Sequence, residues 1–117
     1  MSTIQRIDPG ARMSGAVVHG NTVYLSGQVA LDAGGESVTV QTQNILDRID
    51  VLLEKAGTNK GKLLSASIWL ADISTFGEFN AVWDAWVDPA ATPARATVES
   101  RLAAPQFTVE IAVIAAI

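Results

Sequence analysis

Short apolar segments rich in β-branched residues fill much of the first thirty positions. Residues 14–19 and 22–28 are of this kind, and the Gly20-Asn21 dipeptide between them is a two-residue hairpin signal. A weaker strand pattern lies near residues 4–7. The N-terminal third therefore predicts a β-hairpin with a short strand before it.

The spacing of apolar residues then changes to that of a helix. The polar and Gly-rich segment 32–36 breaks the strand pattern. After it, apolar side chains recur at helical spacing: Val40, Ile45, Ile49, Leu52, Leu53 and Ala56. Gly57 is a typical C-terminal stop, so the pattern predicts a helix over about residues 38–56.

The second half of the chain carries one more helix signal between strands. The nearly continuous apolar run 63–71 predicts a central strand. Thr75, with Glu78 three residues later, has the form of a capping box, and a helix is expected from there to Pro89. Its apolar face consists of Phe79, Val82, Trp83 and Trp86.

Two more strands, 94–101 and 107–117, are predicted to close the chain. The resulting order, βββαβαββ, indicates an α+β fold with a single sheet and both helices on one face. A length of 117 residues fits one domain, residues 1–117. With 49% hydrophobic and only 17% charged residues, part of the apolar surface is expected to be covered by other subunits.

Composition removes several classes of function. A net charge of −4 opposes binding to nucleic acid and to anionic membranes. The chain has no cysteine and a single histidine, His19, which excludes disulfides, thiolate zinc sites and multi-histidine metal sites. No export signal opens the sequence, and the longest apolar run, 111–117, is far below the ~20 residues of a membrane helix. We therefore expect a cytoplasmic protein that binds neither nucleic acid nor membrane.

Glu110 is the most informative single position. Side chains alternate along a strand, so Glu110 shares a face with apolar residues of the segment 107–117. A carboxylate in such a place needs a cation or several donors, and Arg95 on the preceding strand is the natural candidate. One interpretation is a structural ion pair at a subunit edge. The other is a site in which Arg95 binds a small carboxylic acid and Glu110 holds a water.

Other polar residues are weaker candidates. Ser26-Gly27-Gln28 ends a strand, where Gly lets a ligand approach the backbone, although the triplet also fits a plain strand exit. Asn80 faces either solvent or a site. The three tryptophans are expected in the core or an interface, because no basic patch accompanies them. His19 is expected at the surface, and Arg12 is either a surface charge or a second cation beside the pocket.

Five short motifs, taken together, are similar in order and spacing to those of a known family. They are Ser26-Gly27-Gln28, the helix 43–57, Phe76 with Asn80, Pro93-Ala94-Arg95, and Val109-Glu110-Ile111. In this respect the chain resembles the RidA/YjgF family of imine deaminases from about residue 12 to residue 115. The resemblance implies a chorismate-mutase-like fold assembled as a homotrimer, with clefts between subunits.

The resemblance also implies roles for individual residues. Arg95 would bind the substrate carboxylate with help from the backbone N–H of Thr97, and Glu110 would hold the attacking water. Ser26, Gly27 and Asn80 would line the cleft. The implied reaction is hydrolysis of a 2-imino acid, such as 2-iminobutanoate or 2-iminopropanoate, or its enamine, to a 2-keto acid and ammonia. It needs no metal and no cofactor, because a protonated imine is already a strong electrophile.

One position departs from the family pattern. Met13 stands where many members carry a tyrosine that contacts ligands, so the pocket wall becomes more apolar and loses a hydrogen-bond donor. Two alternatives remain beside the deaminase. The chain could be a non-catalytic trimeric protein that binds or senses small carboxylates. An endoribonuclease or translation inhibitor, an activity attached to some members, is disfavoured by the acidic charge.

Overall fold

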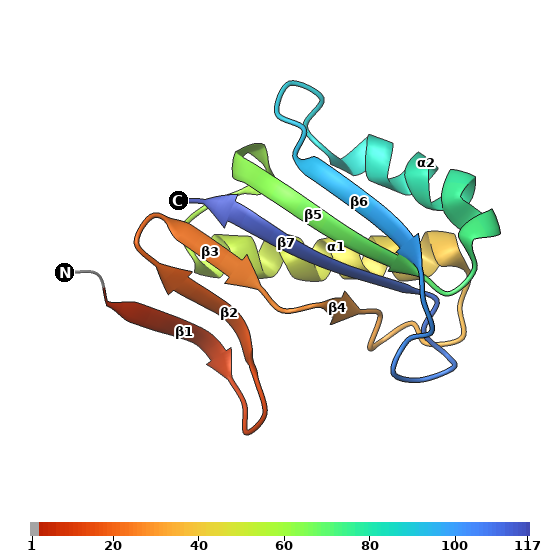
Figure 1. Ribbon diagram of the computed structural model, residues 1–117, viewed down its shortest axis with the longest axis horizontal. Helices are drawn as coiled ribbons and strands as arrows, with labels where there is room; N and C mark the ends of the chain where they lie inside the picture. Colours follow the sequence, from red (N-terminus) through yellow and green to blue (C-terminus); the bar gives the residue numbers. More distant parts are fainter. Residues whose placement is uncertain (1–2) are drawn as a thin grey trace.

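The computed structural model describes residues 3–117 and forms one mixed sheet of seven strands with two helices (Figure 1). The strands are β1 (Ile4–Pro9), β2 (Ser14–His19), β3 (Thr22–Leu25), β4 (Gln28–Val29), β5 (Leu63–Leu70), β6 (Ala94–Glu99) and β7 (Val109–Ala116). Their order is β1-β2-β3-β7-β5-β6, and β4 also pairs with β7. Among the strands of residues 3–117, only the β5–β6 pair is parallel. The predicted α+β fold with a single sheet is confirmed.

The predicted hairpin is present as β2 and β3. Gly20, with φ 61°, and Asn21 connect the ladder partners His19 and Thr22. A positive φ at the first central position suits Gly, and such turns match the twist of the two strands. The weak N-terminal strand is also present, as β1, which pairs with β2.

Both predicted helices form. Helix α1 (Val38–Lys55) begins after Ser37, whose side chain accepts a hydrogen bond from the Val40 N–H, and it ends just before Gly57 with φ 82°. Helix α2 (Phe76–Trp86) follows directly on a single-turn 3₁₀ segment, Ile73–Thr75, and a second such segment, Lys60–Lys62, precedes β5. No helix in residues 3–117 is long and apolar enough to cross a membrane.

The predicted capping box at the start of α2 is wrong. The Thr75 hydroxyl donates to the Asp72 carbonyl at 2.6 Å and makes no cap. Glu78 instead accepts hydrogen bonds from the N–H and the hydroxyl of Thr39, each at 2.9 Å, in the first turn of α1. A carboxylate is favourable there because the N-terminus of a helix carries partial positive charge. Glu78 therefore joins the two helices.

The last two strands are shorter than predicted. Residues 100–108 form a loop, in which Pro105 has no N–H to offer a ladder and the Phe107 N–H donates to the Ala104 carbonyl at 3.2 Å. The strands therefore cover Ala94–Glu99 and Val109–Ala116 rather than 94–101 and 107–117.

The core lies between the sheet and the helices. Alternate residues of β7 (Val109, Ile111, Val113 and Ala115) are buried, as the strand periodicity predicts. Phe79, Trp83 and Trp86 of α2 and the apolar stripe of α1 pack in the same cluster. In Figure 1 α1 runs behind β5 and β7, and the near face of the sheet carries no helix or loop. The chain thus covers one face of its sheet and leaves the other face open.

Gln41 is a fully buried polar residue in the apolar stripe of α1. Its amide nitrogen donates to the carbonyls of Glu36 and Gln106, at 3.0 and 2.9 Å, and its amide oxygen accepts from the Thr108 N–H at 2.9 Å. The 100–108 loop is thereby fixed to the start of α1. Buried polar groups of this kind are costly unless every partner is present.

We predict that Gln41→Leu lowers the free energy of unfolding by about 3 kcal/mol, because it leaves the Glu36 carbonyl and the Thr108 N–H without partners. Urea unfolding at a fixed protein concentration measures the loss. Gln43→Leu is the control, since Gln43 is exposed and bonds only Asp47. Equal stability of the two variants would contradict a stabilising role for the Gln41 hydrogen bonds.

Candidate functional site

Arg95 lies on the helix face of β6, half-buried against α2. It is in register with the buried Ala66 of β5, and its Nη2 donates to the Asn80 side-chain oxygen at 2.9 Å. The guanidinium carbon lies 5.6, 5.7 and 5.4 Å from the ring centroids of Phe76, Phe79 and Trp83. Aromatic faces attract a cation but leave most of its N–H donors free. Among residues 3–117 no carboxylate pairs with this guanidinium.

Thr97 lies two residues further along the same edge strand. The Ser100 N–H donates to the Leu70 carbonyl of β5, so by alternation the N–H groups of Arg95 and Thr97 point away from β5. In the described part of the chain β6 is the last strand on that side of the sheet. The Thr97 N–H is therefore a free donor beside the guanidinium, while its hydroxyl oxygen is buried without a partner.

Glu110 lies on the opposite face. Its ladder partners are Trp69 on β5 and Val29 on β4, and its face of β7 is the one that no helix covers. Burial raises the pKa of its carboxyl above the ordinary 4.5. Within residues 3–117 the carboxylate accepts no hydrogen bond and forms no ion pair. A half-buried carboxylate without a cation is costly to keep charged.

Gly27 lies directly against this carboxylate. A Cβ atom built on Gly27 would overlap Glu110 Oε2, so only glycine allows the carboxylate this position. Gly27 falls in a break that the sequence did not predict, since the expected strand 22–28 divides into β3 and β4. Three residues, 25–27, stand opposite two residues, 112 and 113, of β7, which makes a β-bulge.

Within one chain the expected pairing of Arg95 with Glu110 does not occur. Arg95 is level with Val113 of β7, three residues from Glu110, which separates the two by about 10 Å along the strands. They also project from opposite faces of the sheet. The chain therefore carries two half-sites: Arg95, Asn80 and Thr97 form the cation half-site, and Gly27, Glu110 and neighbouring Ser26 form the carboxylate half-site.

The remaining candidates lie apart from both half-sites. Met13 is 61% exposed at the tip of the β1–β2 hairpin, which lies at the opposite edge of the sheet from β6. His19 is exposed, as expected, and Arg12 is exposed as well. Trp83 and Trp86 are buried, and Trp69 is half-buried on the open face. No group of three or more His, Asp or Glu side chains among residues 3–117 is placed to hold a metal ion.

Comparison with known proteins agrees with this architecture. The family model described as Endoribonuclease L-PSP matches residues 3–117. The chain belongs to the RidA/YjgF/L-PSP family, also called RutC. It is 46% identical over 113 residues to a RutC family protein of Haemophilus influenzae, covering 97% of each chain. It is also 46% identical over 116 residues to the RutC family protein YoaB of Escherichia coli, covering 98% and 99%.

Solved structures show the same family fold. A crystal structure of a YjgF family member from Neisseria meningitidis superposes with a TM-score of 0.94 at 41% identity, covering 97% of this chain and 94% of that one. A structure described as a putative translation initiation inhibitor from Salmonella typhimurium gives a TM-score of 0.86 at 40% identity, covering 98% of both. The first is described by its family alone and the second by an activity, although both share one fold.

Sequence reasoning missed how Ser26 and Gln28 act. The Ser26 hydroxyl donates to the Gly15 carbonyl at 3.1 Å and accepts from the Gln28 amide at 3.1 Å, so it is engaged inside the chain.

The contacts of Trp83 with Arg95 were missed as well, because tryptophans at helical spacing are typical of a core. Gln41 had a visible signal, since it stands four residues before Ile45 on the apolar stripe of α1.

We predict that Glu110→Gln raises the thermal stability at neutral pH by about 1–4 °C, because it removes a charge that burial disfavours. The folded-state pKa is raised, so the native carboxyl loses stability as pH rises through it. Below the ordinary pKa both states are protonated and the difference should vanish. Thermal unfolding at pH 7 and at about pH 4 checks this.

A Glu110→Gln variant that is less stable than wild type at neutral pH would contradict this prediction. It would mean that a cation, such as one in a structural ion pair between copies, compensates the charge of Glu110 in the assembled protein. Asp84→Asn is the control for a general charge effect, because Asp84 is exposed on α2 and its side chain makes no ion pair within residues 3–117.

Proposed function

We propose that the protein is a homotrimeric deaminase that hydrolyses 2-imino acids, with Arg95 of one copy and Glu110 of the next in each site. One observation carries the proposal. A half-buried guanidinium and a half-buried carboxylate both lack a charged partner among residues 3–117, and they face opposite sides of the sheet. Uncompensated charges in such places are typical of sites that bind and react rather than of structural pairs.

The cation half-site suits a small carboxylate. Arg95 has donors left after its bond to Asn80, and a guanidinium presents two parallel N–H groups to a carboxylate. The outward N–H of Thr97 adds a third donor. The three rings behind Arg95 restrict the guanidinium to a narrow range of positions. One anionic group, rather than a chain of phosphates, is the ligand that these donors match.

The carboxylate half-site supplies acid–base chemistry. Glu110 accepts a proton from a water molecule while the water oxygen bonds to the imine carbon, which gives a tetrahedral amino alcohol. It then returns that proton to the amino nitrogen. As the carbon–nitrogen bond breaks, the carboxylate takes the proton of the new hydroxyl group, which leaves the 2-keto acid, and passes it to the departing ammonia, which is released as ammonium. A raised pKa suits this role, because the group must both take and give a proton near neutral pH. The electrophile is the protonated imine itself.

The open face of the sheet supports assembly. Its residues are mostly apolar and include Tyr24, 47% exposed, Val98, 50% exposed, Ile114 and half-buried Trp69. A contiguous apolar face on a chain with few charges is typical of a subunit interface. A copy seated on this face lies on the same side of the sheet as Glu110. The missing cation half-site can then come from that copy.

Arg95→Ala is predicted to abolish hydrolysis of 2-iminobutanoate while the assembly persists, because the variant loses the carboxylate anchor but no part of the open face. Arg95→Lys should keep a charge but raise KM about tenfold or more, since it lacks the two parallel donors. The imine is generated from 2-aminobutanoate by an amino-acid oxidase, and its decay is followed by competition with semicarbazide. Light scattering reports the assembly. Wild-type protein with no effect on imine decay would contradict the deaminase.

The same variants also test the alternative in which the protein binds small carboxylates without turnover. A non-catalytic trimer that senses small carboxylates would be stabilised thermally by 2-oxobutanoate through Arg95, without turnover. For an endoribonuclease, RNA cleavage would have to disappear in Arg95→Ala or Glu110→Gln. Cleavage that follows a contaminating fraction instead would remove that alternative.

Mixing two inactive variants tests whether each site is shared. Arg95→Ala keeps Glu110, and Glu110→Gln keeps Arg95, so a site between one copy of each can be complete. Random exchange of subunits should restore about a quarter of wild-type sites. The variants are mixed, exchanged by mild denaturation and refolding, and assayed with the same imine. Activity that stays at the level of the separate variants would show that both groups come from one chain or that the roles are wrong.

A further inference from the structure

We propose that Ser26 and Gln28 are positioning residues that hold a β-bulge and thereby keep Gly27 beneath the Glu110 carboxylate. In this assignment the Ser26 side chain does not bind substrate. The inference rests on the proposed function for its kinetic consequences. Its structural core is the set of contacts around residues 25–28.

The bulge changes which side chains face Glu110. In β3, Tyr24 is opposite Ile114 on the open face, and regular alternation from there would place Gln28 on the open face as well. The extra residue reverses this. Gln28 is instead opposite the buried Ile111, on the helix face, and Gly27 stays on the open face beside Glu110. Bulges commonly re-aim side chains in this way.

Four hydrogen bonds hold the bulge in place. The Ser26 N–H and hydroxyl both donate to the Gly15 carbonyl of β2, at 2.9 and 3.1 Å. The Gln28 amide nitrogen donates to the Ser26 carbonyl at 3.2 Å and to the Ser26 hydroxyl oxygen at 3.1 Å. The bulge interrupts the pairing with β7 at this point, whereas the Ser26 N–H continues the backbone pairing with β2, and the three side-chain bonds reinforce the segment. We call the Ser26–Gln28–Gly15 set the brace.

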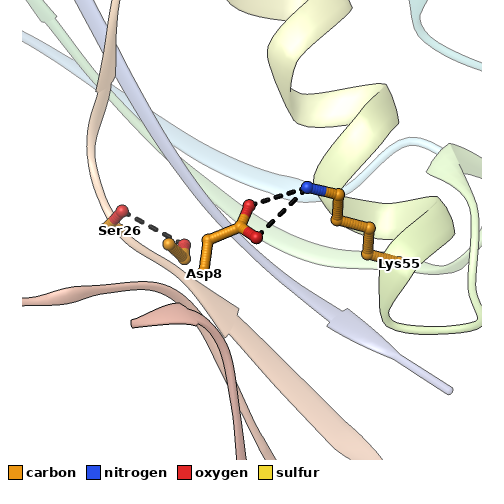
Figure 2. Close-up of polar contacts among 4 residues, drawn as sticks. Asp8, Ser26 and Lys55 are labelled. Carbon is orange, nitrogen blue, oxygen red and sulfur yellow. Dashed lines mark hydrogen bonds and ion pairs between the residues drawn. The ribbon is translucent and has the colours of Figure 1, made fainter. Parts of the chain in front are cut away.

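The brace is anchored to the rest of the molecule through β1 and α1. Figure 2 shows the Ser26 side chain in its hydrogen bond and the Asp8–Lys55 ion pair close by, with Lys55 Nζ at 2.9 and 3.2 Å from the two Asp8 oxygens. A Cβ on Gly15 would come within 3.2 Å of Leu52 and 3.4 Å of Asp8. Asp8 has φ 49°, an uncommon conformation for a residue other than glycine. The tight packing at Gly15 fixes the carbonyl that receives both Ser26 donors.

The consequence for Glu110 follows from its surroundings. Val29 on β4, Trp69 on β5 and Val98 on β6 share its level in the sheet, and none of them carries charge. Gly27 is thus the backbone against which the carboxylate rests. If the bulge loses its geometry, Gly27 moves, and the Glu110 carboxylate becomes more exposed to water and more mobile. The cation half-site on the other face keeps its geometry, because it depends on α2 and β6.

The test compares Ser26→Ala and Gln28→Met with wild type. Both should lower kcat about tenfold and leave KM within about twofold, because the carboxylate anchor is untouched. Ser26→Thr keeps the hydroxyl and should retain most of the activity. Gly27→Ala, whose new methyl overlaps Glu110, should lose about a hundredfold in kcat. Gln43→Met is the matched control on an exposed glutamine that bonds Asp47.

A second measurement separates this inference from the proposed function. The Glu110 side-chain carbon is titrated by NMR in wild type, Ser26→Ala and Gln28→Met, which needs no substrate. A pKa that moves toward the ordinary value in the two variants, but not in Gln43→Met, supports the brace even if no imine is hydrolysed. An unchanged titration in folded variants would overturn it. So would a Ser26→Ala enzyme with normal kcat and raised KM, since that result assigns Ser26 to substrate binding.

Discussion

A sheet of seven strands has two faces to bury, and this chain supplies helices for only one of them. The helix face is closed by α1 and α2, whose apolar stripes bury alternate residues of β7 and β5. The open face presents Tyr24, Ile114 and Val98 without any cover from residues 3–117. Burying such a face against another copy is worth on the order of 25 cal/mol for each Å² removed from water. The chemistry of the molecule is arranged around this open face.

The two charged groups lie on opposite faces of the sheet, so they cannot form an ion pair within a single chain. Arg95 projects toward α2, where Asn80 and three rings hold it, and Glu110 projects from the open face over Gly27. An ion pair inside one chain would have neutralised both and left nothing for a ligand. By separating them, the fold leaves both groups without a charged partner among residues 3–117, as the proposed carboxylate binding and proton transfer require. The cost appears as the raised pKa of Glu110.

Periodicity in the sequence predicts the elements well because it depends on local burial. The 3.6-residue spacing before Gly57 gave α1 nearly to the residue, and alternation from residue 107 placed Glu110 on the correct face. The failures involve partners distant in the chain. Glu78 caps α1 instead of its own helix, because Thr39 lies beside it only after the helices pack.

The bulge and the two half-sites could not be predicted from local sequence patterns, because they too depend on partners distant in the chain. Whether residues 25–27 continue a strand depends on how they pair with β7, more than eighty positions later. The face on which Arg95 lies depends on its parallel register with β5. Family resemblance implied that Arg95, Asn80, Thr97 and Glu110 act as a set. It did not show that they form two groups on opposite faces.

The charges of the described residues also bear on which chemistry the fold serves here. Recognition of an RNA backbone takes several cations along one surface, because each phosphate contact adds to affinity. In this chain Arg48 and Lys55 are engaged with Asp32 and Asp8, and Arg95 is enclosed by rings with one hydrogen-bonded neighbour. Such a cation meets one carboxylate well and a run of phosphates poorly. The enclosure of Arg95 and the net charge of −4 therefore favour the proposed small-carboxylate chemistry over RNA binding in this member of the family.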